Sequence, residues 1–177
     1  MRYPIAHLPI SRLSVALAAT SLAVIGSCTA DFGRFVPGTY VGDIPCTLEV
    51  VSPTGTPGQE TFTENITVTI GSSDAVKING VPVEIGAMHV RTLPNADLAF
   101  EVIEVQQSAA GNLQITYAPR PSLPGIEMSG TLVESYRQDH EGLKANATAE
   151  LELSSIDGIT SFSVVCNGNL SRNATNP

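Results

Sequence analysis

The feature that most constrains the fold is a two-residue alternation of polar and apolar side chains, which recurs along the chain from Gly38 onward. Over residues 144–153 the odd positions are small or apolar and the even positions are polar. Residues 61–70 alternate in the same way, with Glu64 as the single charged side chain on the apolar face. Successive side chains of a strand point to opposite faces of a sheet, so both runs predict antiparallel strands with one buried and one wet face.

The rest of this region also has the pattern of strands joined by turns. No apolar period of 3.6 residues persists, and Val, Ile and Thr recur in short alternating runs. The strongest turn signal is Asn79-Gly80, which predicts a type I′ hairpin. Pro45 and Pro82 must then lie at edges, bulges or ladder positions that need no backbone N–H. We predict an all-β domain over residues 38–173, a single antiparallel meander of about eight to nine strands.

The first 28 residues have the layout of an export signal. Arg2 and Arg12 supply positive charge, and no acidic residue precedes Asp31. Residues 13–25 form an apolar run that is too short to span a bilayer but suits a signal peptide. This run ends in Ile25-Gly26-Ser27-Cys28, which resembles the lipobox of bacterial lipoproteins.

The resemblance to bacterial lipoproteins implies that Cys28 is the lipid attachment site. Residues 1–27 would be the cleaved signal peptide, and residues 28–37 a lipidated tether that anchors the protein in a membrane of the bacterial cell envelope. Thr29, in place of an aspartate after the cysteine, implies the outer membrane over the inner one. Apart from this covalent lipid we expect no cofactor. The alternatives are an ordinary secretory signal with an incidental cysteine and an uncleaved anchor.

The two cysteines that remain after lipidation can be placed by the alternation. Cys46 and Cys166 occupy the apolar, even-numbered face of residues 39–51 and 160–172, so both face the interior. An even number of remaining cysteines in an exported protein predicts a disulfide between them. Such a bridge would link the first and last strands, as in a closed or nearly closed barrel. A β-sandwich with a bridge between its sheets is the alternative.

The charge of the mature chain argues against one class of partner. Removing residues 1–27 takes away Arg2 and Arg12, which leaves seven basic against 17 acidic residues, a formal charge of −10. The acidic residues are spread singly along the chain, which indicates a solvated exterior. This charge disfavours nucleic acid and anionic headgroups as partners.

The two ends of the domain carry a second resemblance. Gly38-Thr39-Tyr40 at its start and Arg172 in its last strand resemble the lipocalin-like calycin barrels, in which Gly-x-Trp begins the first strand and a cation packs across the aromatic ring. Here Tyr40 stands where that family has tryptophan, and the chain has no Trp. The resemblance implies a barrel that holds a small apolar ligand, with Tyr40 and Arg172 as candidate contacts.

Motifs for catalysis or metal binding are absent from the sequence. It contains no Gly-x-Ser-x-Gly, Walker A, GxGxxG, HExxH or CxxC pattern. His140 lies in a polar turn that we expect to be solvated, and we expect His89 at the surface or at a rim. We therefore predict neither an enzyme nor a metal site.

Two segments stand out from this background. Residues 99–105 have apolar side chains on both faces, which suggests a strand that is covered on both sides or that lines a contact. Residues 119–125 form a loop stiffened by three prolines that offers Arg120 and Leu123 to a ligand or partner, although a rigid connection between strands is the favoured interpretation.

We expect a non-enzymatic envelope lipoprotein that binds a small apolar ligand or an envelope partner. The alternatives are a structural or adhesion module without a ligand and an envelope hydrolase. A ligand-binding barrel predicts internal gaps near Gly42, Gly130 and Gly168. A hydrolase would need a pocket in which His89 or His140 meets a nucleophile.

Overall fold

The computed structural model describes residues 34–173 apart from residues 56, 95, 121–125 and 157. Its elements are β1 (Gly38–Val51), β2 (Pro57–Ile70), β3 (Val76–Ile78), β4 (Val81–Pro82), β5 (Met88–Leu93), β6 (Ala96–Ser108), β7 (Asn112–Arg120), β8 (Glu127–Gln138), β9 (Gly142–Ser155) and β10 (Gly158–Arg172). The described part contains no helix, so the all-β prediction is confirmed. The strands number ten instead of eight or nine because β3 and β4 are short pieces of one hairpin.

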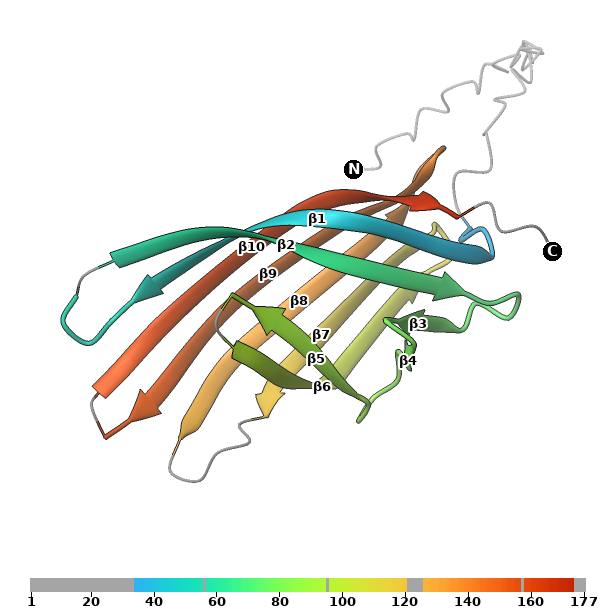
Figure 1. Cartoon of the computed structure of the whole chain (residues 1–177). Helices are drawn as coiled ribbons and strands as arrows, with labels where there is room; N and C mark the ends of the chain where they lie inside the picture. The colour runs from blue at the N-terminus through green and yellow to red at the C-terminus, as the bar shows by residue number, and fades with distance from the viewer. Residues whose placement is uncertain (1–33, 56, 95, 121–125, 157, 174–177) are drawn as a thin grey trace, which may run out of the picture.

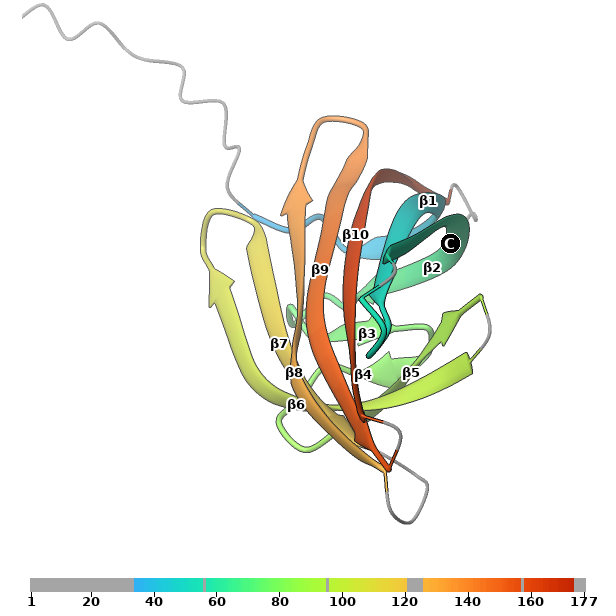
Figure 2. The same ribbon diagram turned by 90° about the vertical axis from the view of Figure 1, so that its left-hand side faces the viewer.

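The strands form one antiparallel sheet that curls into a nearly closed barrel (Figures 1 and 2). Their order is β4-β3-β2-β1-β10-β9-β8-β7-β6-β5, so the barrel prediction holds and the sandwich alternative is wrong. The sheet has two edges, β4 and β5. In the described chain no backbone ladder joins β5 to β2 or to β4, and this leaves an opening that we call the seam.

The predicted disulfide joins the first and last strands. Cys46 of β1 is the register partner of Cys166 of β10, and their Cα atoms lie 4.1 Å apart. Their even-numbered neighbours line the core, among them Ile44 and Leu48 of β1 and Val164 of β10. The alternation therefore assigned the inward face of both strands correctly.

The predicted hairpin is also present. Asn79 and Gly80 both have positive φ angles, 50° and 82°, as a type I′ turn requires. Pro82 lies in the edge strand β4, and Pro45 lies where the β1–β10 pairing is interrupted, between Val41 and Cys46. Neither proline therefore interrupts a continuous ladder.

The prediction that residues 99–105 are covered on both sides is wrong. The β6–β7 register shifts between Val102 and Glu104, so Ile103 is an extra residue in a β-bulge. The bulge changes the phase of the alternation, so Phe100 and Val102 face the core while Ile103 is 43% exposed.

The two ends of the barrel differ in how their side chains are packed and exposed. At the near end, where β1 begins, the side chain of Phe35 is buried against the core. The Val36 N–H donates to Gln138 Oε1 (3.0 Å), and the Tyr40 hydroxyl donates to the Val36 carbonyl (2.7 Å). The far end, where β1 finishes, is lined by apolar side chains that are only half-buried, including Val50, Phe62, Leu93, Leu98 and Phe162.

Candidate functional site

A cluster of charged and phenolic side chains lies inside the barrel. This buried cluster consists of Glu64 (β2), Arg91 (β5), Tyr117 (β7), and Glu134 and Tyr136 (β8). Arg91 is 5% exposed and Glu134 is 1% exposed. Each of these side chains occupies the inward phase of its strand, so the same alternation that builds the apolar core brings them together.

Glu134 is the centre of the buried cluster, because it accepts bonds from three neighbours. Arg91 donates from Nε to Glu134 Oε1 (2.6 Å) and forms an ion pair from its terminal nitrogen (2.5 Å). The hydroxyls of Tyr117 and Tyr136 donate to Oε2 at 2.9 and 3.0 Å. A buried carboxylate with this many donors is satisfied, which offsets much of the cost of its desolvation.

The electrostatics keep the groups in defined protonation states. Burial alone would lower the pKa of Arg91, but the carboxylate of Glu134 raises it above its ordinary value, so the guanidinium stays charged. Burial and the charge of Glu134 raise the pKa of both Tyr117 and Tyr136, which keeps the hydroxyls protonated as donors. One cation thus faces two carboxyl groups, those of Glu134 and Glu64.

Glu64 connects the buried cluster across the seam. Its Oε1 lies 3.6 Å from Arg91 Nε, so the ion pair joins β2 to β5 where no backbone ladder does. Burial raises the pKa of Glu64 above the ordinary 4.5; Arg91 opposes this shift and Glu134 adds to it. Glu64 therefore stays protonated to a higher pH than an exposed glutamate does, and when it is ionised it pairs with Arg91 across the seam.

His89 is also inside, and the prediction that it lies at the surface or rim is wrong. It is 1% exposed, its ring packs edge-on against Tyr117 with centroids 5.4 Å apart, and Nε2 lies 3.2 Å from the Pro82 carbonyl. Burial, followed by the charge of Arg91, lowers the pKa of His89. The neutral imidazole with an Nε2–H donor fits this environment.

The interior offers little room beside these groups. A cavity of about 30 Å³ lies between the buried cluster and the far end, lined by Phe62, Leu93, Leu132 and Ala149 among others. A water molecule needs about 10–15 Å³, so the cavity has room for one or two waters. The gaps expected near the three glycines are absent: Gly168 packs on the Ile44 side chain, and a Cβ on Gly42 or Gly130 would overlap neighbouring backbone atoms.

The disulfide borders the buried cluster. The sulfur atoms of Cys46 and Cys166 and a carboxylate oxygen of Glu64 lie within 4.8 Å of one another. This arrangement has the residue types of a metal site, but thiolates are the metal-binding form of cysteine and both sulfurs are joined in the bridge.

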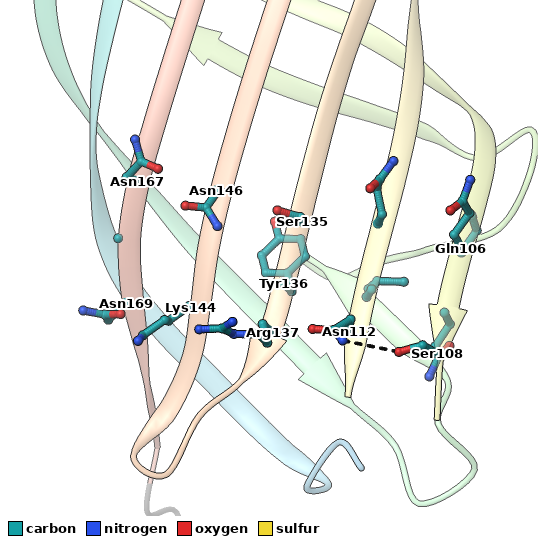
Figure 3. Close-up of a pocket in the computed structure, with 15 residues that line it drawn as sticks. Gln106, Ser108, Asn112, Ser135, Tyr136, Arg137, Lys144, Asn146, Asn167 and Asn169 are labelled. Atoms are coloured by element: carbon teal, nitrogen blue, oxygen red, sulfur yellow. Dashed lines mark hydrogen bonds between the residues drawn. The ribbon is translucent and has the colours of Figure 1, made fainter. Parts of the chain in front are cut away.

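A wide open groove lies on the outer face of the sheet. A groove of about 1160 Å³ crosses β6 to β10 near their near-end turns, and we call it the outer groove (Figure 3). Polar side chains line it in two rows, each residue directly opposite the next on the neighbouring strand. The first row is Asn167, Asn146, Ser135, Gln114 and Gln106; the second is Asn169, Lys144, Arg137, Asn112 and Ser108.

Most side chains of the outer groove point into solvent without a protein partner. In the part of the chain that the structure describes, the bonds made by these two rows are few: Gln106 donates to Glu104 (2.8 Å), Asn112 donates to Ser108 (3.4 Å), Ser108 also accepts from the Ala110 N–H (3.3 Å), and Lys144 pairs with Asp139 (3.0 Å). The second is the dashed line in Figure 3. The remaining amides and Arg137 are available to a ligand.

The contact residues predicted from the sequence do not form one site. Tyr40 is buried and is the register partner of Arg172. The Arg172 side chain donates to the Pro37 carbonyl (2.7 Å), so both residues pack at the near end of the barrel. Arg120 is exposed at the far end and forms an ion pair with Glu101. Leu123 and Cys28 lie outside the described residues, and His140 lies in the exposed β8–β9 turn, as predicted.

The sequence analysis did not identify Arg91, Glu134 or the groove, although the two charged residues lie at inward positions of their alternating runs. Glu64 was the exception in its alternating run, and Arg91 and Glu134 are charged residues in the same inward phase as His89 and Leu132. The groove combines Asn, Gln and Ser from five strands, so its signal becomes visible only once the strand registers are known.

No helix long and apolar enough to cross a bilayer occurs among the described residues. No protein-family model matches the chain, and neither a curated protein nor a solved structure matches it.

Proposed function

We propose that the protein is a lipid-anchored, non-enzymatic lipoprotein of a bacterial cell envelope that binds an envelope partner along the outer groove. The observation that carries the proposal is the distribution of space: about 1160 Å³ in the outer groove against about 30 Å³ inside the barrel. Sites for small ligands typically measure about 300–1,000 Å³. A partner on the outer face therefore fits this molecule better than an apolar ligand in its interior.

The anchoring part of the proposal rests on the N-terminal sequence, with Ile25-Gly26-Ser27-Cys28 after an apolar run. Residues 28–37 would span at most about 35 Å when extended, and they lead to the near end of the barrel. The second row of the outer groove borders the near-end turns, including that between Gln138 and Gly142. A partner in the groove would therefore belong to the envelope close to the membrane that holds the lipid, with the outer membrane favoured because Thr29 follows the cysteine.

The absence of catalysis is supported by how the titratable groups are occupied. The Glu134 carboxylate accepts bonds from Arg91 and two tyrosines, and His89 Nε2 is engaged by the Pro82 carbonyl. Acid–base catalysis needs a group that can reach the proton of a substrate. Both groups are committed to the protein: Glu134 lines a cavity with room for only one or two waters, and His89 is buried.

Anchoring is tested by substituting Cys28→Ser in the full chain and following metabolic incorporation of a radioactive fatty acid. The wild-type protein should carry the label and sediment with membranes, and the variant should carry none. A variant that still incorporates fatty acid would contradict lipidation at Cys28. Lys77→Gln, a substitution of an exposed residue in β3, is the matched control and should label like the wild type.

Partner binding is tested with a chain that starts at Thr29, which keeps every described residue. We expect it to co-sediment with washed envelope fragments, and the double variant Gln114→Ala/Asn146→Ala to lose most of that binding. The control Gln59→Ala/Thr61→Ala truncates two exposed side chains of β2, outside the groove, and should sediment like the wild type. Equal sedimentation of all three would place the binding surface elsewhere and defeat the proposal.

A further inference from the structure

We infer that the partner of the outer groove is an extended, hydroxyl-rich polymer that carries acid groups, an acidic polysaccharide; this inference rests on the proposed function. The first reason is the local charge. Neither row of the groove contains a carboxylate, and the second contains Lys144 and Arg137, in a mature chain whose formal charge is −10. The groove is thus a place where the local charge is opposite to that of the molecule.

The placement of these two cations points to an anion. Arg137 and Lys144 are direct register partners on β8 and β9, and both side chains are exposed on the outer face (Figure 3). Like charges directly opposite each other destabilise a sheet. Asp139 relieves Lys144 at 3.0 Å, whereas Arg137 has no ion pair with any described residue. A phosphate, sulfate or carboxylate group between them would compensate both cations and suit the donor fork of the guanidinium.

The overall negative charge does not prevent such contact. The Debye length is about 8 Å at physiological ionic strength, so acidic residues elsewhere on the barrel are largely screened from an acid group at Arg137. Two carboxylates that border the groove are themselves engaged, Asp139 by Lys144 and Glu104 by Gln106, whereas Glu141 is exposed in the neighbouring β8–β9 turn. The charge of the whole molecule weakens the binding of a uniformly dense polyanion, and it favours a polymer whose acid groups are spaced along a neutral backbone.

The remaining side chains suit hydroxyl groups. Each amide of Asn167, Asn146 and Gln114 offers two N–H donors and one acceptor oxygen, and hydroxyls are both donors and acceptors. Strands lie about 4.8 Å apart, so rows across five strands span about 19 Å, which suits an extended chain better than a compact molecule. The polar rows contain no aromatic side chain on which a sugar ring could stack. The affinity must therefore come from hydrogen bonds and charge, and it must fall with salt.

The test uses the chain that starts at Thr29 and two polymers with the same backbone, dextran sulfate of a low degree of sulfation and neutral dextran, with binding measured by isothermal titration calorimetry. We expect binding of dextran sulfate that weakens as NaCl is added, and no measurable binding of dextran. Arg137→Gln should lower the affinity about tenfold, the usual size of one charge-assisted hydrogen bond. Lys77→Gln removes one exposed cation outside the groove and should leave the affinity unchanged.

Four outcomes would overturn the inference: no binding of dextran sulfate, equal binding of dextran and dextran sulfate, equal losses for Arg137→Gln and Lys77→Gln, or binding of polyglutamate that matches dextran sulfate and is insensitive to Asn146→Ala. The last result would indicate an acidic peptide segment. If the groove variants lose envelope binding while dextran sulfate does not bind, the proposed function stands and only the polysaccharide falls. Binding to phosphatidylcholine vesicles that contain a sialylated glycolipid is then compared with binding to soluble polygalacturonate. Preferential binding to the vesicles would indicate a membrane-linked glycan, and preferential binding to polygalacturonate a free one.

Discussion

The buried cluster and the outer groove are made of polar side chains that lie on opposite faces of the sheet and share two strands, β7 and β8. On β8, Glu134 and Tyr136 point inward, while Ser135 and Arg137, next to them in the chain, point outward. Inside, Glu134 is bonded by three neighbours; outside, most side chains have no protein partner. Buried polar groups must form hydrogen bonds within the protein, whereas exposed polar groups can bond to water and remain accessible to a ligand. The inner face therefore serves stability, and the outer face serves recognition.

The inner network also explains how the barrel closes. The seam between β2 and β5 has no backbone ladder in the described chain, and the ion pair of Glu64 with Arg91 spans it. Arg91 in turn is fixed by Glu134 on β8, across the interior. Side chains thus do at the seam what backbone hydrogen bonds do between the other strands.

The largest effect should come from removing the cation of the buried cluster. Arg91→Met leaves Glu134 and Glu64 without their counter-charge, and breaking a buried pair in this way costs about 3–5 kcal/mol of unfolding free energy. Urea unfolding measures the loss. Arg120→Met breaks the exposed pair with Glu101 and should cost at most about 1 kcal/mol. Similar losses for both variants would contradict the distinction between the two faces.

The next largest effect concerns the disulfide beside the buried cluster. Cys46→Ala/Cys166→Ala opens a bridge between residues 120 positions apart, and removal of a native disulfide typically costs about 2–5 kcal/mol. The same unfolding experiment under non-reducing conditions measures it, and alkylation of the denatured, unreduced wild type should label neither Cys46 nor Cys166. Labelling of both in the wild type would refute the bridge.

A smaller effect should appear as a pH dependence through Glu64. Folding raises the pKa of Glu64 above the ordinary 4.5. The protonated side chain therefore contributes to the free energy of unfolding in full below pH 4.5, and this contribution is lost as the pH rises through the pKa of the folded state. Glu64→Gln stays neutral, so the unfolding free energy of the variant should fall less between about pH 4 and about pH 8 than that of the wild type. Parallel profiles for the two proteins would show that Glu64 does not titrate in this window.

The smallest effect on stability should come from the outer groove. Gln114→Ala/Asn146→Ala removes exposed amides that have no protein partner, so its unfolding free energy should stay within about 0.5 kcal/mol of the wild type. Thermal and urea unfolding check this. A loss of 2 kcal/mol or more, about the size of a lost buried contact, would mean that the groove is structural and would remove the contrast with the interior.

What the sequence by itself determined is the face of each strand. A period of two residues decides whether a side chain points in or out, and this was enough to place Cys46 and Cys166 in the core. The positive φ angles that Asn79-Gly80 tolerates were enough to place the hairpin. Both are local properties, set by neighbouring residues of the chain.

Only the tertiary structure decided which inward and outward side chains meet. The alternation does not reveal how far the sheet curls, so it could not bring Glu64, Arg91 and Glu134 together from β2, β5 and β8. Nor could it locate the bulge at Ile103, the burial of His89, or the rows of the outer groove, which depend on the register of five strands. Contacts between distant strands arise from closure and register, and these are set by the packing of the whole core, which no single segment encodes.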